Sequence, residues 1–240
     1  MPPAPLPYPC LGVVMPCFNE EDTVLEIVER VLKSPWTEQL VIIDDGSTDG
    51  TPALLDSLSD ARVLVVHQPR NTGKGAALRE GFRRVSSPYV VVQDADLEYD
   101  PAEYPVLLGP LLEGHADVVY GSRFASTPSR RVLYFWHTVG NRLLTVLSNV
   151  TTNLNLSDME TCFKAFRLDV VKQLDLQEDR FGIEPEMTAK VARDGWRVYE
   201  VGITYHGRTY AEGKKIGWRD GFQALWCIAR YSPFIERRRR

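Results

Sequence analysis

The chain has 240 residues, of which 44% are hydrophobic and 25% charged, and its formal net charge is −4. This composition is typical of a globular domain and excludes global disorder. Apolar runs such as Leu11–Met15 are far shorter than the ~18 residues that a membrane-spanning helix needs. Four scattered cysteines without metal-ligand spacing argue against a disulfide scaffold and favour a reducing, cytoplasmic compartment.

We expect a single domain, residues 11–232, after a Pro-rich and disordered lead-in of residues 1–10. Charge is unevenly distributed along the chain: residues 207–240 carry nine Lys and Arg against three acids, so this segment is +6 and the remainder is −10. A basic end on an acidic body predicts an anionic partner near the C-terminus. For the basic tail, residues 233–240 with the run Arg237–Arg240, a purely solubilising role is the equal alternative.

Short apolar segments alternate with amphipathic ones in the first half of the chain. The apolar segments are rich in β-branched residues, as in strands that are covered on both faces. This alternation predicts an α/β fold with a mostly parallel central sheet flanked by helices. The expected strands are Leu11–Met15, Leu40–Ile43, Val63–Val66, Tyr89–Val92 and Val118–Tyr120, and the expected helices are Glu21–Lys33, Thr51–Leu58, Lys74–Arg84 and Ala102–Glu113, the last kinked or ended by Pro110.

The second half is less regular. We expect helices at Leu133–Leu147, Glu184–Arg193 and Trp218–Tyr231, an extended segment at Cys162–Phe166, a strand at Val198–Ile203 and a polar, non-helical stretch at Thr151–Asn155. The helices Leu133–Leu147 and Trp218–Tyr231 are apolar and aromatic enough to lie at a membrane surface, and core packing explains them equally well.

Acidic side chains follow the expected strands. Ligands of open α/β sheets bind beyond the carboxyl ends of the strands. Asp94 and Asp96 come just after Tyr89–Val92, with Glu98 two residues on. Such carboxylates present hard oxygens to Mg²⁺ or Mn²⁺, which also bind substrate phosphates. A solvated turn explains an isolated Asp-x-Asp triplet, but the position after a buried strand favours a site for a metal and a diphosphate.

Seven motifs follow one another along the chain: Pro16-Cys17-Phe18-Asn19-Glu20, Asp44-Asp45-Gly46-Ser47-Thr48-Asp49-Gly50, Asn71-Thr72-Gly73-Lys74-Gly75, Asp94-Ala95-Asp96, Gly121-Ser122-Arg123, Asp158-Met159-Glu160-Thr161-Cys162-Phe163-Lys164 and Arg208-Thr209-Tyr210-Ala211-Glu212-Gly213-Lys214. In this order they resemble family 2 glycosyltransferases with the GT-A fold. The last two resemble the dolichyl-phosphate mannose synthase and polyprenyl-phosphate glycosyltransferase branch. The resemblance implies a nucleotide-sugar-binding half, residues 11–120, and an acceptor half, residues 121–232.

The resemblance also implies roles on the donor side. Asp96 would be a catalytic residue, and Lys74 either meets a donor phosphate or is a solvated lysine at a helix start. Glu98 stands where the branch commonly has Gln, which leaves its role as a ligand open. The implied nucleotide-sugar-binding residues are Pro16, Asn19, Glu20, Asp45, Lys74, Asp94 and Ala95, and the implied metal ligands are Asp94, Asp96 and Glu98.

On the acceptor side, the resemblance implies that Arg123, Arg208 and Lys214 bind the phosphate of a lipid, with Arg208 also catalytic. An exposed charged loop is the alternative for Arg208 and Lys214. A phosphate oxygen is already ionised at neutral pH, so its attack needs placement rather than a strong base. Asp158 is a catalytic candidate: with Glu186 it would supply a base for a hydroxyl acceptor, or orient Lys164 or Arg208 for a phosphate acceptor.

We therefore expect an inverting glycosyltransferase dependent on Mg²⁺ or Mn²⁺. It would move a hexose from a GDP-mannose or UDP-glucose type of donor to a polyprenyl phosphate, through peripheral contact at the cytoplasmic face of a membrane, with no role for nucleic acid. One alternative is transfer to a soluble glycan or small hydroxyl acceptor, and the other is a nucleotide-sugar-binding protein without turnover. The sequence decides neither the sugar nor the base.

Overall fold

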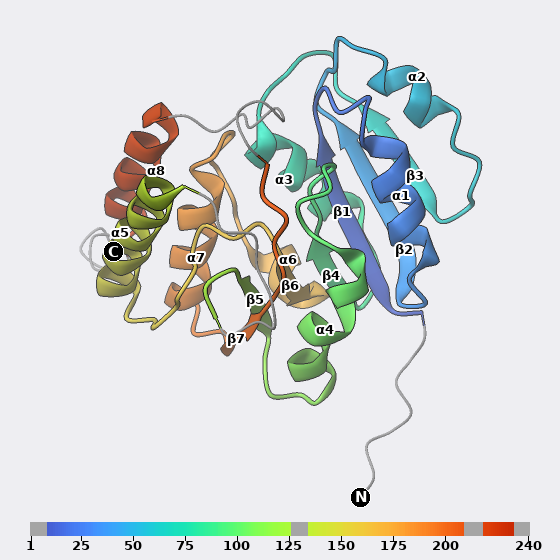
Figure 1. Ribbon diagram of the computed structural model, residues 1–240. Coiled ribbons are helices and arrows are strands. Elements are labelled where there is room, and N and C mark those ends of the chain that lie inside the picture. The colour runs from blue at the N-terminus through green and yellow to red at the C-terminus, as the bar shows by residue number, and fades with distance from the viewer. Residues whose placement is uncertain (1–8, 126–133, 209–217, 233–240) are drawn as a thin grey trace, which may run out of the picture.

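The computed structural model describes residues 9–125, 134–208 and 218–232. Its centre is a seven-stranded sheet with the order β3-β2-β1-β4-β6-β5-β7 (Figure 1). The strands are β1 (Leu11–Cys17), β2 (Thr37–Asp44), β3 (Val63–His67), β4 (Tyr89–Val92), β5 (Val118–Ser122), β6 (Lys164–Arg167) and β7 (Val198–Gly202). All pairs are parallel except those of β6, which runs antiparallel to β4 and β5. The predicted α/β fold with a mostly parallel sheet is confirmed.

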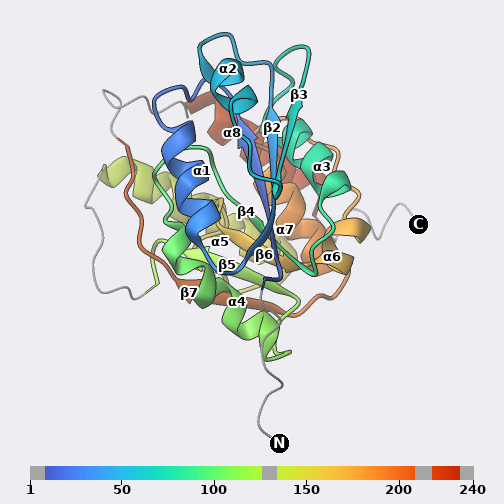
Figure 2. The same cartoon turned by 90° about the vertical axis from the view of Figure 1, so that its right-hand side faces the viewer.

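Helices cover both faces of the sheet. The helix α1 and the α4 region lie on one face, and α3 and α6 on the other (Figure 2). The helix α1 packs with the buried face that its sequence pattern predicts, Val24, Ile27, Val28 and Val31. The helices are α1 (Val24–Lys33), α2 (Thr51–Asp56), α3 (Lys74–Arg84), α4 (Tyr104–Leu112, after a 3₁₀ turn at Pro101–Glu103), α5 (Phe135–Thr152), α6 (Leu168–Gln173), α7 (Ile183–Arg193) and α8 (Trp218–Arg230).

Two helix boundaries differ from the prediction. The helix α4 continues through Pro110 to Leu112; the carbonyl that loses its partner belongs to Val106, an exposed residue that water can reach. The helix α5 includes Thr151 and Thr152, which we expected to be non-helical. Their hydroxyls donate to the Ser148 carbonyl, so the polar side chains satisfy the last turn rather than compete with it. The helix α6 was not expected from the sequence.

The topology brings the sequence motifs to one edge of the sheet. Because β1, β2 and β4 are parallel neighbours, their carboxyl ends lie side by side. The Asp45 amide donates to the Cys17 carbonyl at 2.8 Å, and the Thr23 hydroxyl donates to the Ala95 carbonyl at 3.0 Å. The loops after the three strands are therefore tied together. Among the described helices, none is both long and apolar enough to cross a bilayer.

Candidate active site

A pocket of ≈ 470 Å³ opens at this edge of the sheet. Acidic, basic and apolar side chains line it, and they come from motifs in both halves of the chain. Its lining residues are Pro16, Cys17, Phe18, Glu20, Asp45, Asn71, Gly73, Lys74, Ala77, Asp94, Ala95, Asp96, Glu98, Arg123, Arg180, Phe181, Tyr205 and Arg208.

Asp45 lines the pocket, and Asn19 ties together two of the loops beside it. The buried Asp45 carboxylate accepts hydrogen bonds from the Thr72 amide and hydroxyl and from the Gly73 amide, at 2.7–2.9 Å. Asn19 has φ +52°, and its Oδ1 accepts from the Thr48 amide at 2.8 Å. Asn19 is not among the lining residues, so its observed contacts hold the two loops in place. Asp45 both lines the pocket and fixes the glycine loop beside it.

A buried chain of alternating charges lies beneath the Asp-x-Asp motif. Lys74 Nζ lies 2.9 Å from Asp94 and 3.6 Å from Glu184, and Glu184 also pairs with the buried Lys164. Burial is the largest single influence and opposes the charge on Lys74, but the neighbouring Asp94, Cys162 and Glu184 together outweigh it and raise the pKa of the ammonium well above its usual value. The solvated reading of Lys74 is therefore wrong: this lysine is held against Asp94 at the wall of the pocket.

Arg208 lies among three carboxylates of the pocket, those of Glu20, Asp96 and Glu98. Its Nη2 lies 2.6 Å from Asp96 Oδ2, its Nη1 lies 3.3 Å from Glu20 Oε2, and its backbone amide donates to Glu98 Oε1 at 2.7 Å. Burial, followed by the charges of Asp94 and Glu98, raises the pKa of Asp96 to about 7. The negative charges of Glu20, Asp96 and Glu98 lie close together, and the single positive charge of Arg208 neutralises them only in part.

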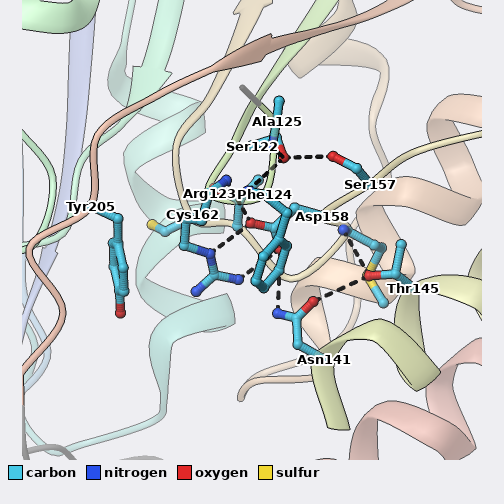
Figure 3. Close-up of polar contacts among 12 residues, drawn as sticks. Ser122, Arg123, Phe124, Ala125, Asn141, Thr145, Ser157, Asp158, Cys162 and Tyr205 are labelled. Carbon is cyan, nitrogen blue, oxygen red and sulfur yellow. Dashed lines mark hydrogen bonds and ion pairs between the residues drawn. The ribbon is translucent and has the colours of Figure 1, made fainter. Parts of the chain in front are cut away.

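Arg123 is the second pocket cation, and Asp158 holds it. The fully buried Asp158 carboxylate receives Nε and Nη2 of Arg123, both at 2.7 Å, together with the Arg123 amide at 3.0 Å (Figure 3). Asn141 of α5 adds a contact at 3.3 Å. The other side of the guanidinium lies over the Tyr205 ring, 5.2 Å from its centroid. Asp158 does not line the pocket, and its carboxylate fixes the orientation of Arg123, which does.

Lys164, Arg208 and Glu186 have ion-pair partners other than those we expected. Lys164 pairs with Glu184 and Arg208 with Asp96, so neither is oriented by Asp158 or Glu186 as we expected. Glu186 instead pairs with Lys190 and accepts from the Gln177 and Glu178 amides. Lys214 lies outside the described residues.

Sequence reasoning missed Arg180, Phe181 and Tyr205 as pocket residues. Arg180 and Phe181 come just before α7, outside the seven motifs. Tyr205 stands between β7 and Arg208, and its hydroxyl donates to Glu98 Oε2 at 2.8 Å. The Arg208 motif was the nearest available signal for Tyr205, whereas nothing in the pattern marked the other two.

The acidic residues fit a divalent cation of one particular type. Among the described residues, no cluster of three or more His, Cys, Asp or Glu side chains is arranged to enclose a metal. Mg²⁺ usually binds through one or two carboxylates and completes its shell with water and substrate phosphates. The crowded charge around Asp96 fits that mode, in which the substrate supplies the remaining ligands.

A family model described as "Glycosyl transferase family 2" matches residues 12–175. The chain belongs to this family. The match confirms the predicted family, which is a class of glycosyltransferases. The matched residues include the loops that carry Asp45, Asp94 and Asp96 as well as Arg123, and they end before Arg180 and Arg208.

Several curated relatives of this family 2 member have names that include a lipid phosphate. The chain is 30% identical over 214 residues to the polyprenol monophosphomannose synthase of Mycolicibacterium smegmatis, covering 85% of this chain and 80% of the relative. It is 29% identical over 218 residues to the undecaprenyl-phosphate mannosyltransferase of Micrococcus luteus, covering 85% and 86%. The low-salt glycan biosynthesis hexosyltransferase of Haloferax volcanii is 32% identical over 88% of this chain, which spans only 52% of that relative.

Solved structures agree on the fold. Glucosyl-3-phosphoglycerate synthase from Mycobacterium tuberculosis, in complex with Mn²⁺ and UDP-glucose, superposes with a TM-score of 0.73 at 20% identity, covering 93% of this chain and 79% of that one. This similarity confirms that the fold of the family 2 chain is that of a GT-A glycosyltransferase.

Proposed function

We propose that this chain is a metal-dependent, inverting hexosyltransferase that moves a sugar from a nucleoside diphosphate sugar to a polyprenyl phosphate. The observation that carries the proposal is the juxtaposition of Asp94, Asp96 and Glu98 with Arg123 and Arg208 in a single pocket. The carboxylates suit a donor diphosphate bound through a metal, and the arginines suit a second anion, the acceptor phosphate. The names of the two mannosyl-transferring relatives support this pair of substrates.

The arginines would hold the acceptor in two different ways. Arg123 is fixed by Asp158 and Tyr205, so it offers its remaining Nη1 from a set position. Arg208 Nε is buried, makes no hydrogen bond among the described residues and lies 3.6 Å from Glu98 Oε1, so it would become available to a phosphate once the guanidinium moves away from Glu98. An unused N–H of a guanidinium is a strong donor to a phosphate oxygen.

The reaction then depends mainly on holding the acceptor phosphate in line with the bond that breaks. An ionised oxygen of the acceptor phosphate attacks the anomeric carbon, the bond from that carbon to the diphosphate oxygen breaks, and the configuration inverts. No proton leaves the nucleophile, so the buried, ion-paired Asp158 is not needed as a base. Asp94, Asp96 and Glu98 would hold Mg²⁺ or Mn²⁺, which supplies charge neutralisation for the departing diphosphate. Lys74 keeps Asp94 ionised and in place.

We also propose that one face of the molecule contacts the membrane that contains the acceptor. The helices α5 and α8 lie side by side (Figure 1), and both carry exposed apolar side chains. Within α5 no residue is acidic, and Asn141 of this helix reaches Asp158, the partner of Arg123. The acceptor end of the pocket is thus linked to the apolar helix face. We call this face, formed by Phe135, Trp136, Leu143, Val146, Val150, Phe222 and Trp226, the α5–α8 face.

A transfer assay tests the proposed function. Purified protein with Mn²⁺ receives GDP-mannose or UDP-glucose and either a detergent-solubilised polyprenyl phosphate or a neutral glycan, and release of nucleoside diphosphate is followed. We expect transfer to the lipid phosphate. Transfer to the neutral glycan alone would establish the soluble-acceptor alternative. Binding of a nucleotide sugar without release of nucleoside diphosphate, whichever acceptor is added, would establish a binding protein.

A further inference from the structure

The segment of residues 177–181 is held tightly against the start of α3. The fully buried Glu186 accepts from the Gln177 and Glu178 amides at 2.7 and 2.8 Å. Arg79 Nη1 donates to the Glu178 carbonyl at 2.7 Å. The Ala76 amide donates to the Asp179 carbonyl at 3.1 Å. The backbone of this segment is therefore fixed from both sides.

The approach is close enough to require glycine on both sides of Lys74, the first residue of α3. A Cβ at position 75 would lie 2.1 Å from the Glu178 carbonyl oxygen, and one at position 73 would lie 2.3 Å from the Asp179 carbonyl oxygen. Gly73 also has φ +110°, which side chains disfavour. The glycines that flank Lys74 thus serve the seating of the 177–181 segment. Arg180, the residue after Asp179, is held in place by the same contact.

The fixed segment delivers Arg180 to the pocket. Arg180 Cγ would lie 2.9 Å from a Cβ at position 73, so the stem of the arginine passes over Gly73. The side chain is exposed and lines the same pocket as Lys74 and Asp94. Its guanidinium extends from a backbone that has little freedom to move.

Arg180 differs from the other basic side chains of the pocket in its electrostatic partners. Lys74 faces Asp94 at 2.9 Å, Arg123 faces Asp158 at 2.7 Å and Arg208 faces Asp96 at 2.6 Å. No carboxylate of the residues that the structure describes lies within 4.0 Å of Arg180. The neighbouring Asp179 pairs with Arg79 instead. Arg180 therefore presents a positive charge to the pocket that these residues do not neutralise.

We propose that Arg180 is a phosphate-binding residue of this pocket. The proposal rests on the proposed function, which places two kinds of phosphate there: the donor diphosphate and the acceptor monophosphate. Both offer the same chemistry, an anionic oxygen for a charged N–H donor. The experiment has an arm for each.

The donor arm measures binding alone. The affinities of wild type, Arg180→Ala and Arg180→Lys for GDP, UDP and inorganic pyrophosphate are determined by thermal-shift titration with Mn²⁺ present. If Arg180 binds the diphosphate, Arg180→Ala weakens binding roughly tenfold, and Arg180→Lys recovers part of the loss because it keeps the charge without the fork. Arg83→Ala is the matched control, since Arg83 is an exposed arginine of α3 that pairs with Glu80 outside the pocket.

The acceptor arm measures KM for polyprenyl phosphate at saturating donor. A rise of roughly tenfold in Arg180→Ala, with unchanged nucleotide and pyrophosphate affinity, assigns Arg180 to the acceptor phosphate. Unchanged values in both arms, or equal losses in Arg83→Ala, overturn the proposal. Weaker pyrophosphate binding in Arg180→Ala, in a protein that transfers no sugar, would support Arg180 while overturning the proposed function.

Discussion

Arg208 Nη2 lies 2.6 Å from Asp96 Oδ2, so the arginine expected to bind the acceptor contacts a carboxylate expected to bind the metal. The two predicted subsites therefore share one ion pair. A divalent cation and the guanidinium would compete for Asp96, because each neutralises the same oxygen.

Removing the arginine should separate these roles. In Arg208→Ala we expect Mn²⁺ to bind several-fold more tightly, because Asp96 is released from its competitor. We expect kcat/KM for the lipid phosphate to fall roughly ten- to a hundred-fold, as for loss of a charge-assisted contact. Calorimetric titration with Mn²⁺ and acceptor kinetics check the two effects. Weaker Mn²⁺ binding in the variant would show that Arg208 supports the metal site.

Asp96→Asn should abolish turnover and leave the fold intact. The amide retains the shape of the side chain but loses the charge that a divalent cation needs. Circular dichroism and thermal unfolding serve as the control for folding, and nucleoside diphosphate release at saturating Mn²⁺ measures activity. A variant with near-normal rates would remove Asp96 from the metal site.

The buried pair of Arg123 and Asp158 should act as a unit. Breaking such a pair by removing one partner costs about 3–5 kcal/mol when both are fully buried; Arg123 is 17% exposed, so we expect the lower end. Asp158→Ala should also raise KM for the acceptor, because Arg123 loses its orientation. A double-mutant cycle with Arg123→Ala, followed by urea unfolding, measures the coupling. Strictly additive losses would contradict a coupled pair.

His67 should make stability depend on pH. A hydrogen bond to Asp44, aided by Asp56, raises the pKa of His67 above 6.5. The folded state therefore binds the proton more tightly than the unfolded state. The resulting stabilisation is complete below about pH 6.5 and is lost as pH rises through the folded-state pKa.

Urea unfolding of wild type and His67→Gln between pH 5.5 and 8.5 measures this contribution. We expect the difference between the two free energies of unfolding to shrink as pH rises. His115→Gln is the control, since His115 lies on the surface beside Glu113. A difference that stays constant across this range would refute the assignment.

The α5–α8 face should bind lipid through its aromatic residues. Trp136 and Trp226 are 78% and 53% exposed, and burying such side chains in the interfacial region favours binding. The double variant Trp136→Glu/Trp226→Glu should therefore lose co-sedimentation with vesicles that contain anionic lipid. Tyr199→Glu, which changes an exposed aromatic residue of β7, should bind like wild type. Equal binding by all three proteins would contradict a membrane role for this face.

The sequence by itself determined the strand and helix pattern of the first half and the order of its acidic loops. Continuous β-branched runs are local signals, and so is Asp100 before Pro101, a capping residue followed by a first-turn proline; none of them depends on distant partners. The parallel alternation then required the loops of β1, β2 and β4 to share one edge, which was enough to place Asp45, Asp94 and Asp96 at a single site.

Only the tertiary structure decided which charges neutralise one another. Lys74 meets Asp94 and Glu184 because the start of α3, the loop after β4 and the start of α7 converge, and Arg208 meets Asp96 because the chain after β7 returns across the pocket. Arg180 came to the pocket through the contact of its neighbours with Gly73, just before α3, and Gly75, in its first turn. Lys74 and Asp94 are 20 positions apart, and the other pairings join residues more than a hundred positions apart, so no local pattern encodes them. They follow from the way in which the antiparallel β6 joins the two halves of the sheet.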